Sequence, residues 1–314
     1  MTATSARSIR IEENDVATSL DEPATVPPAA TPTGAAPAPV PTRSAPARRR
    51  PWVQKLINAI LPVTAFAALI GFWYAVTYLV LDPDRRFLLP APHVVITDAL
   101  LDEKARDRIG EALWQTIVVT STGLVIAIVI GMLWAIAMSQ ARTIERSLFP
   151  YAVALQCIPI LALVPLIGFW FGYGFNSRVI VCVMIALFPI VSNTLFGLQS
   201  VDRGMHELFT LHGVGRLTRL RKLQLPAAMP AIFAGFRISA GLSVVGAIVG
   251  DLFFKQGTPG LGILLDNYRS RLQGPELFLT ILVAAGLGFA VFLLFGALSR
   301  LAVGRWYDQG RDAG

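Results

Sequence analysis

A stretch of 30 residues without a charged side chain, residues 112–141, reads ALWQTIVVTSTGLVIAIVIGMLWAIAMSQA. A helix needs about 20 apolar residues to cross the hydrocarbon core of a bilayer, so this stretch is long enough to span it. Four similar uncharged runs lie elsewhere in the chain, and a fifth, 223–250, is interrupted only by Arg237. Because the backbone must satisfy its hydrogen bonds internally in lipid, we expect these runs to be helices. The sequence therefore predicts an all-α polytopic membrane protein with six transmembrane helices, at about 56–81, 112–138, 148–170, 179–200, 226–250 and 277–299.

The overall composition agrees with a membrane protein. Charged residues make up 15% of the 314 residues, against about 25% in ordinary globular chains, and the mean hydropathy is +0.59. The net charge of +7 is compatible with nucleic-acid binding, but arginine on the cytoplasmic side of a membrane explains it better. With both termini inside, 15 Lys and Arg lie near the inner side and nine lie outside the membrane. We therefore predict cytoplasmic termini and no nucleic-acid partner.

The first 50 residues differ in kind from the rest of the chain. Between Pro23 and Arg48, eight prolines and eight alanines fill 16 of 26 positions. Such a segment has little apolar surface to bury, so residues 1–50 are expected to form a disordered cytoplasmic tail, with 51–314 as the membrane domain. The tail is interpreted as a spacer, with a docking role as the alternative.

The loop between the fourth and fifth spans, 202–225, is long and amphipathic. Apolar residues recur at helical spacing on both sides of Gly213 and Gly215. Glycine suits a tight turn, and Leu225-Pro226 is suited to a helix start. The pattern predicts a helix–turn–helix hairpin at the cytoplasmic face with an apolar surface that needs a partner. Glu207 is expected near the start of the first helix, where a carboxylate interacts well with the helix dipole.

These loop residues resemble the EAA loop of binding-protein-dependent ABC importer permeases. The motif E-A-A-x₃-G-x₉-I-x-L-P is matched by Glu207, Gly213 and Leu225-Pro226, whereas Leu208, Phe209 and Leu223 replace the alanines and isoleucine. Further matches lie in order along the chain: PILALVPL at 159–166, WFGYG at 170–174, Phe188-Pro189 with Asn193-Thr194, and PGLG at 259–262. Together they resemble the nitrate/sulfonate/taurine branch, which includes permeases for pyrimidine-type vitamin precursors.

The resemblance implies an ABC type I importer permease-like fold and a specific set of partners. Relatives act in the bacterial inner membrane as homodimers, with a cytoplasmic ABC ATPase and an extracytoplasmic binding protein. The chain would then bind no cofactor or metal and have no catalytic residues, because ATP is used by the ATPase subunit. The resemblance implies that the residues contacting the ATPase are Glu207, Leu208, Phe209, Gly213, Leu223, Leu225 and Pro226.

Polar residues inside the spans are candidates for a substrate pathway, because polar groups in lipid are costly and usually face a bundle interior or a pore. We select Gln156, Asn193, Arg237 and Ser239, each with interhelical hydrogen bonding as the alternative. Arg237 costs about 2.5–3.5 kcal/mol at mid-span unless it faces water or a partner. Asp251 lies about 21 Å further along the same helix, so Arg237 faces either the pathway or the dimer interface.

Two other classes of protein compete with the permease. An integral-membrane enzyme needs clustered acids, histidines or metal ligands, and the three histidines and 20 acids form no such set. The chain has no Walker A motif, so it is not expected to hydrolyse ATP itself. A secondary transporter would more often have visible inverted repeats. The sequence favours the permease subunit of an importer for a small solute of sulfonate, taurine, nitrate or pyrimidine type.

Overall fold

The structure, a computed structural model, describes the backbone of residues 51–307 and the side chains of residues 60–302 and 304. The predicted tail, 1–50, lies outside the described residues. Among the described residues, those from Ile57 to Tyr307 belong to one compact unit. The helices are α1 (Pro51–Ala75), α2 (Pro92–Val94), α3 (Glu103–Ser139), α4 (Arg142–Cys157), α5 (Ile160–Phe171), α6 (Phe175–Gln199), α7 (Arg203–Leu211), α8 (Arg216–Arg219), α9 (Leu225–Phe253), α10 (Leu261–Ser270) and α11 (Gly274–Tyr307). Short π-helical turns cover Val76–Val80, Val95–Leu100 and Leu220–Gln224, and a 3₁₀ turn covers Pro83–Leu88.

Within the described residues, five helical segments are long and apolar enough to cross a membrane: Ile60–Val80, Glu103–Ser139, Phe175–Gln199, Arg216–Phe253 and Gly274–Ala302. A sixth span requires α4 and α5 together, and these two helices meet at a bend of 97°. The third predicted span, 148–170, is therefore formed by two helices with a break near its middle. Ile158 is extended (ψ 124°) because the ring of Pro159 disfavours helical backbone in the preceding residue, and α5 starts only after that proline.

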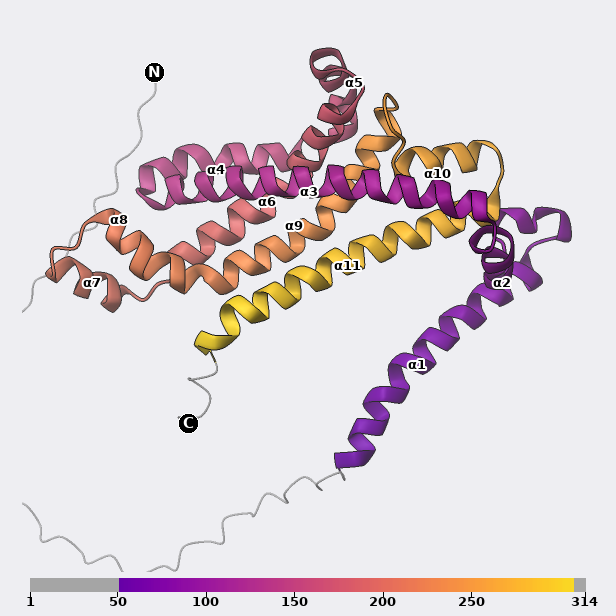
Figure 1. Ribbon diagram of the computed structural model, residues 1–314. Coiled ribbons are helices and arrows are strands. Elements are labelled where there is room, and N and C mark those ends of the chain that lie inside the picture. The colour runs from indigo at the N-terminus through magenta and orange to yellow at the C-terminus, as the bar shows by residue number, and fades with distance from the viewer. Residues whose placement is uncertain (1–50, 308–314) are drawn as a thin grey trace, which may run out of the picture. The chain divides into compact units, whose positions relative to one another are not determined.

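The core of the bundle is formed by α3, α6 and α9, which pack side by side (Figure 1). Small side chains line their contacts, and Ala127 on α3, Ala186 on α6 and Ala247 on α9 are all fully buried. Small residues let helix backbones approach closely, which is the usual basis of helix association in lipid. Helix α11 packs against α9.

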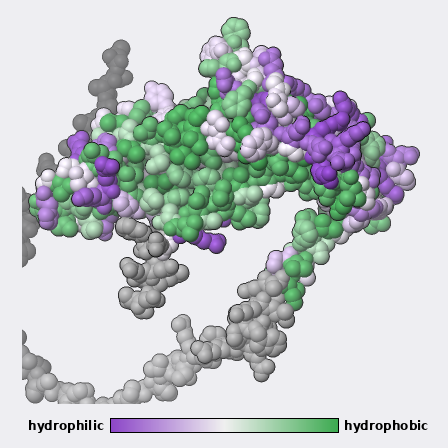
Figure 2. Space-filling model, viewed as in Figure 1, coloured by the Kyte–Doolittle hydropathy of each residue, from purple (hydrophilic) through white to green (hydrophobic). Residues whose placement is uncertain are grey.

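Much apolar surface stays uncovered by this chain. Only 6% of the most apolar window of Ile60–Val80 is buried, against 50% for that of α6. On the face shown in Figure 2, hydrophobic residues cover the middle of the bundle, whereas hydrophilic residues gather around α7 and α8 at one end and around α10 at the other. This distribution matches an apolar zone between two aqueous faces. It places the predicted hairpin and α10 at opposite faces.

Candidate coupling hairpin and buried polar network

The loop after α6 folds into the predicted hairpin. Helix α7 ends at Leu211, and Gly213 follows two residues later with φ 64°, in the left-handed region that glycine adopts without strain. The Gly213 N–H donates to the Thr210 carbonyl (3.0 Å) and the Val214 N–H to the Phe209 carbonyl (3.1 Å), which is the hydrogen-bond pattern of a Schellman motif. The Arg219 guanidinium then donates to the Thr210 hydroxyl (2.9 Å) and ties α8 back to α7. The turn predicted at Gly213 is thus confirmed by its geometry.

The start of α7 differs from the prediction. The helix begins at Arg203, so Glu207 is its fifth residue and lies beyond the first turn. The helix dipole acts most strongly within that first turn, so its effect on Glu207 is smaller than predicted. The cap is Asp202, whose carboxylate accepts from the Gly204 N–H at 2.6 Å. Glu207 is exposed and therefore free to meet a partner, but it does not stabilise the helix end.

The hairpin presents one set of apolar residues to the outside and buries another. Met205 and Leu208 are each 46% exposed, and Leu217 is 67% exposed, although all lie outside the apolar zone. Leu220, in the turn between α8 and α9, is buried with Leu198 of α6. The outward set can contact another protein, whereas the inward set fixes the hairpin to the bundle.

The other predicted coupling residues divide between these two sets. Phe209 is half-buried beside the turn. Leu223 is buried, Leu225 packs against the cluster around Leu198, and Pro226 is half-buried in the first turn of α9. Leu223, Leu225 and Pro226 therefore attach the hairpin to the bundle.

The four pathway candidates lie in different surroundings. Gln156 is exposed on α4. The Asn193 side-chain amide donates to the Pro189 carbonyl within α6 (2.8 Å). The buried Ser239 hydroxyl of α9 donates to the Ala186 carbonyl of α6 (2.6 Å). Ser239 thus makes the interhelical hydrogen bond of the alternative interpretation, whereas the bond of Asn193 lies within α6, and Gln156 has the most accessible side chain of these three.

Arg237 points from α9 toward α11. Its guanidinium carbon lies 3.8 Å from the centroid of the Phe292 ring, a cation–π contact, and the guanidinium also lies beside Gly296. Its Nε is buried and has no hydrogen-bond partner among the described residues. The aromatic face of Phe292 therefore supplies part of the compensation that a cation at this depth requires.

The most completely buried charges are Arg178 and Asp251, with side chains that are each 1% exposed. Arg178, in the first turn of α6, lies 3.1 Å through its Nη1 from Asp251 Oδ1 near the end of α9. The same guanidinium donates to the carbonyls of Phe254, Gln256 and Thr258, each at 2.8 Å. One arginine therefore holds the whole segment that leads from α9 to α10.

Asp251 organises the start of α10 from the other side. The Gly262 N–H (3.4 Å) and the hydroxyl of Thr116 on α3 (3.5 Å) donate to Asp251 Oδ2, and the Thr116 hydroxyl accepts from the Leu261 N–H (2.9 Å). A Cβ on Gly262 would lie 2.6 Å from the Asp251 Cβ, so the backbone approaches this closely only with glycine there. This close contact explains why the last position of the PGLG run, 259–262, is a glycine.

Sequence reasoning missed this network because it treated Arg178 as an ordinary extracytoplasmic charge. The available signal was a lone arginine at the start of one span and a lone aspartate at the end of the next. Two such charges at the same membrane face can pair, which is the usual way to bury them. The partner of Asp251 is therefore Arg178.

Comparison with known proteins adds sequence relatives. Residues 127–310 match the family described as "Binding-protein-dependent transport system inner membrane component". The chain is 31% identical over 249 residues to the formylaminopyrimidine transport permease protein ThiX of Halalkalibacterium halodurans, covering 79% of this chain and 96% of the relative. It is 33% identical over 251 residues to the riboflavin transport system permease protein RibX of Chloroflexus aurantiacus, covering 78% and 89%. The predicted resemblance, including its pyrimidine-type members, is confirmed.

A solved structure supports the fold independently. The structure titled "Crystal structure of an amino acid ABC transporter with histidines" contains a chain similar to this one, with a TM-score of 0.51 at 21% identity. The match covers 67% of this chain and 99% of the other. The predicted ABC importer permease-like fold is therefore confirmed, and the long helices around the hairpin have the arrangement of a transmembrane subunit.

Proposed function

This chain belongs to the family of binding-protein-dependent transport system inner membrane components, and from that premise we propose how it works. Two copies form the membrane path of an ATP-driven importer in the bacterial inner membrane, with both termini in the cytoplasm. A separate ABC ATPase subunit hydrolyses ATP, and an extracytoplasmic binding protein delivers the solute. The chain itself is a transport subunit that binds no cofactor.

The observation that carries this proposal is the exposed apolar face of the α7–α8 hairpin. Met205, Leu208 and Leu217 lie outside the apolar zone, on a segment that also exposes Glu207. Exposed apolar patches on a polar face mark sites of protein–protein contact. We assign this face to the ATPase, with Leu208 and Phe209 filling the space that two alanines occupy in the family motif.

The hairpin is built to transmit a displacement. Arg219 fastens α8 to α7, and Leu220 and Leu225 join the hairpin to the cluster formed by α6 and α9. A movement of α7, driven by closure of the ATPase pair, therefore reaches the inner ends of two core helices as one body. Rigid-body motion of this type is a common way in which membrane proteins and oligomers change state.

The transported solute is proposed to be small, of the sulfonate, taurine, nitrate or pyrimidine-precursor type. Relatives named for formylaminopyrimidine and riboflavin transport support the last of these. Gln156, Asn193, Arg237 and Ser239 remain the proposed pathway residues. Gln156 is the strongest of them because its side chain is exposed and the structure gives it no fixed partner among the described residues.

Affinity purification from detergent-solubilised membranes tests the proposal. Tagged wild-type chain should retain an ABC ATPase, identified by mass spectrometry, and Leu208→Asp should lose it while inserting normally. Leu101→Asp is the matched control, because Leu101 is also exposed (69%) but precedes α3 at the opposite face. Solute uptake by purified chain alone, driven by an ion gradient, would instead establish a secondary transporter.

A further inference from the structure

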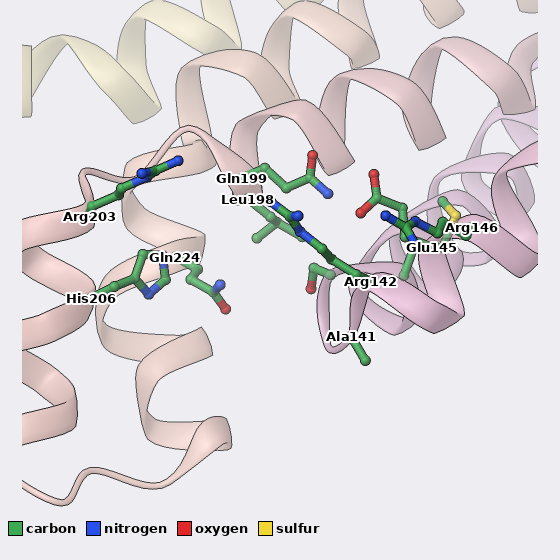
Figure 3. Close-up of a pocket in the computed structure, with 11 residues that line it drawn as sticks. Ala141, Arg142, Glu145, Arg146, Leu198, Gln199, Arg203, His206 and Gln224 are labelled. Carbon is green, nitrogen blue, oxygen red and sulfur yellow. The ribbon is translucent and has the colours of Figure 1, made fainter. Parts of the chain in front are cut away.

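A polar cavity of 620 Å³ lies beside the coupling hairpin, at the cytoplasmic ends of the core helices (Figure 3). Its volume is within the range of small-molecule sites, about 300–1,000 Å³. The walls come from four helix ends and the turn before α9: Met138, Ser139, Ala141, Arg142, Glu145, Arg146, Leu198, Gln199, Arg203, His206 and Gln224. In the sequence its three arginines are part of the inner-side positive charge, whereas the structure brings them together around one space.

The charge that faces this cavity is strongly unbalanced. Arg142, Arg146 and Arg203 line it, and Glu145 is the one acid among its lining residues. None of these four residues takes part in the ion pairs found among the described residues, which involve Arg178, Lys255 and Arg269. Figure 3 shows Arg142 extending toward Gln199 and Leu198 of α6, with Arg203 and His206 on the other side. Three cations therefore surround a space that holds one carboxylate.

The helix ends add to the positive potential of the cavity. Helix α4 starts there, and its cap residue, Ala141, provides no side-chain oxygen for the free N–H groups of the first turn. The opposing carbonyl ends of α3 and α6 are partly satisfied within their own helices: the Ser139 hydroxyl donates to the Ile136 carbonyl (2.7 Å) and the Ser200 hydroxyl to the Gly197 carbonyl (2.8 Å). The partial negative charge of these carbonyl ends is thereby reduced, whereas the partial positive charge at the start of α4 stays available to an anion.

We propose that this cavity binds a phosphate-type oxyanion. Arginine presents planar pairs of N–H donors that match phosphate oxygens, and the Gln199, Gln224 and His206 side chains offer further polar groups. Two sources carry this chemistry at a cytoplasmic membrane face: inorganic phosphate or sulfate from solution, and the headgroup of an anionic phospholipid. The site is separate from the pathway and does not depend on the proposed import function.

Occupancy of the cavity has a structural consequence. Arg142 and Arg146 belong to α4, whereas Arg203 and His206 belong to the first part of α7. An oxyanion held between them joins the coupling helix to the start of the bent third span. It also relieves the repulsion among the three arginines, so the bound state should be the more stable one.

The test uses the full chain in nanodiscs of phosphatidylcholine, titrated with inorganic phosphate and with sulfate by calorimetry. One oxyanion should bind per chain, and Arg142→Gln and Arg203→Gln should each weaken binding by about tenfold or more. Arg216→Gln is the matched control, because Arg216 is an exposed arginine of the same hairpin outside the cavity. Thermal unfolding of each variant checks that it folds.

A second arm identifies the source of the oxyanion. The wild-type chain and the arginine variants are placed in nanodiscs made from equal parts of phosphatidylcholine and phosphatidylglycerol. Native mass spectrometry then counts the phosphatidylglycerol molecules that each chain retains. Binding of phosphatidylglycerol that is lost in Arg142→Gln, without binding of free phosphate, supports the site with a lipid headgroup as its ligand. Equal binding by the cavity variants and Arg216→Gln, or no binding in either arm, overturns the proposal. Variants that change only ATPase retention would place carboxylates of the ATPase in the cavity, which also overturns it.

Discussion

Gly213 shows how one residue determines the shape of the coupling hairpin. Its φ of 64° is strained for residues with a Cβ, at about 1–2 kcal/mol, and asparagine tolerates it better than leucine does. We predict that Gly213→Leu loses ATPase retention and ATP-driven transport while membrane insertion stays normal. Gly213→Asn should keep most of both. Equal activity of the two variants with the wild type would remove the hairpin from the coupling mechanism.

The Arg178–Asp251 pair leads to a prediction about stability. Removing one partner of a buried pair leaves an unmatched charge and typically costs about 3–5 kcal/mol. Asp251→Asn should therefore lower the thermal unfolding temperature of the purified chain clearly, and limited proteolysis should cut faster between residues 254 and 260. Arg269→Gln, at the exposed ion pair with Asp266, is the control and should change neither quantity. An unchanged melting curve for Asp251→Asn would show that the network contributes no stability.

Single residues were predictable from the sequence only where the reason was local. Gly213 was found because a turn between two amphipathic segments needs a residue without a Cβ. The cap Asp202 was not predicted, because the family motif places its acid at Glu207 and does not fix where α7 begins. Arg178 and Asp251 are far apart in the sequence, and no spacing rule connects the first turn of α6 with the end of α9.

At the scale of the elements, hydropathy located the spans but not their internal geometry. The third predicted span, 148–170, contains a bend of 97° between α4 and α5, at the extended Ile158 that precedes Pro159. The apolar residues of the hairpin were predicted to form a surface that needs a partner. In the structure it divides into an exposed part, with Leu217, and a buried part, with Leu220, because the turn before α9 brings the second part against α6.

That division gives a prediction with an internal control. Leu220→Ala removes a side chain that is 8% exposed and should destabilise the chain, by about 2–5 kcal/mol for a buried leucine. Leu217→Ala, three residues earlier and 67% exposed, should leave the melting temperature unchanged but reduce ATPase retention. Thermal unfolding and affinity purification of both variants measure the two effects. If both variants lose stability equally, the hairpin does not have separate inward and outward faces.

At the scale of the whole molecule, the sequence predicted the fold class and the family, but it could not predict what covers the first span. Leu61, Phe66 and Phe72 are each about two-thirds exposed on this chain alone. In a membrane such surface is covered by lipid or by another subunit, and a single sequence does not distinguish these neighbours. The proposed homodimer therefore rests on the family resemblance.

The remaining prediction concerns residues 1–50, whose proline- and alanine-rich composition gives them no means of forming a core. Deleting residues 2–42 keeps the basic cluster from Arg48 to Lys55, which favours the cytoplasmic placement of this end. We expect the truncated chain to insert normally and to support uptake within about twofold of the wild type, since the composition of the deleted segment predicts no core of its own. Before the solute is known, ATP hydrolysis by the reconstituted complex serves as the readout. Complete loss of activity in a stably inserted truncation would show that the segment docks on a partner, and an excess of the free 1–42 peptide should then inhibit the intact complex.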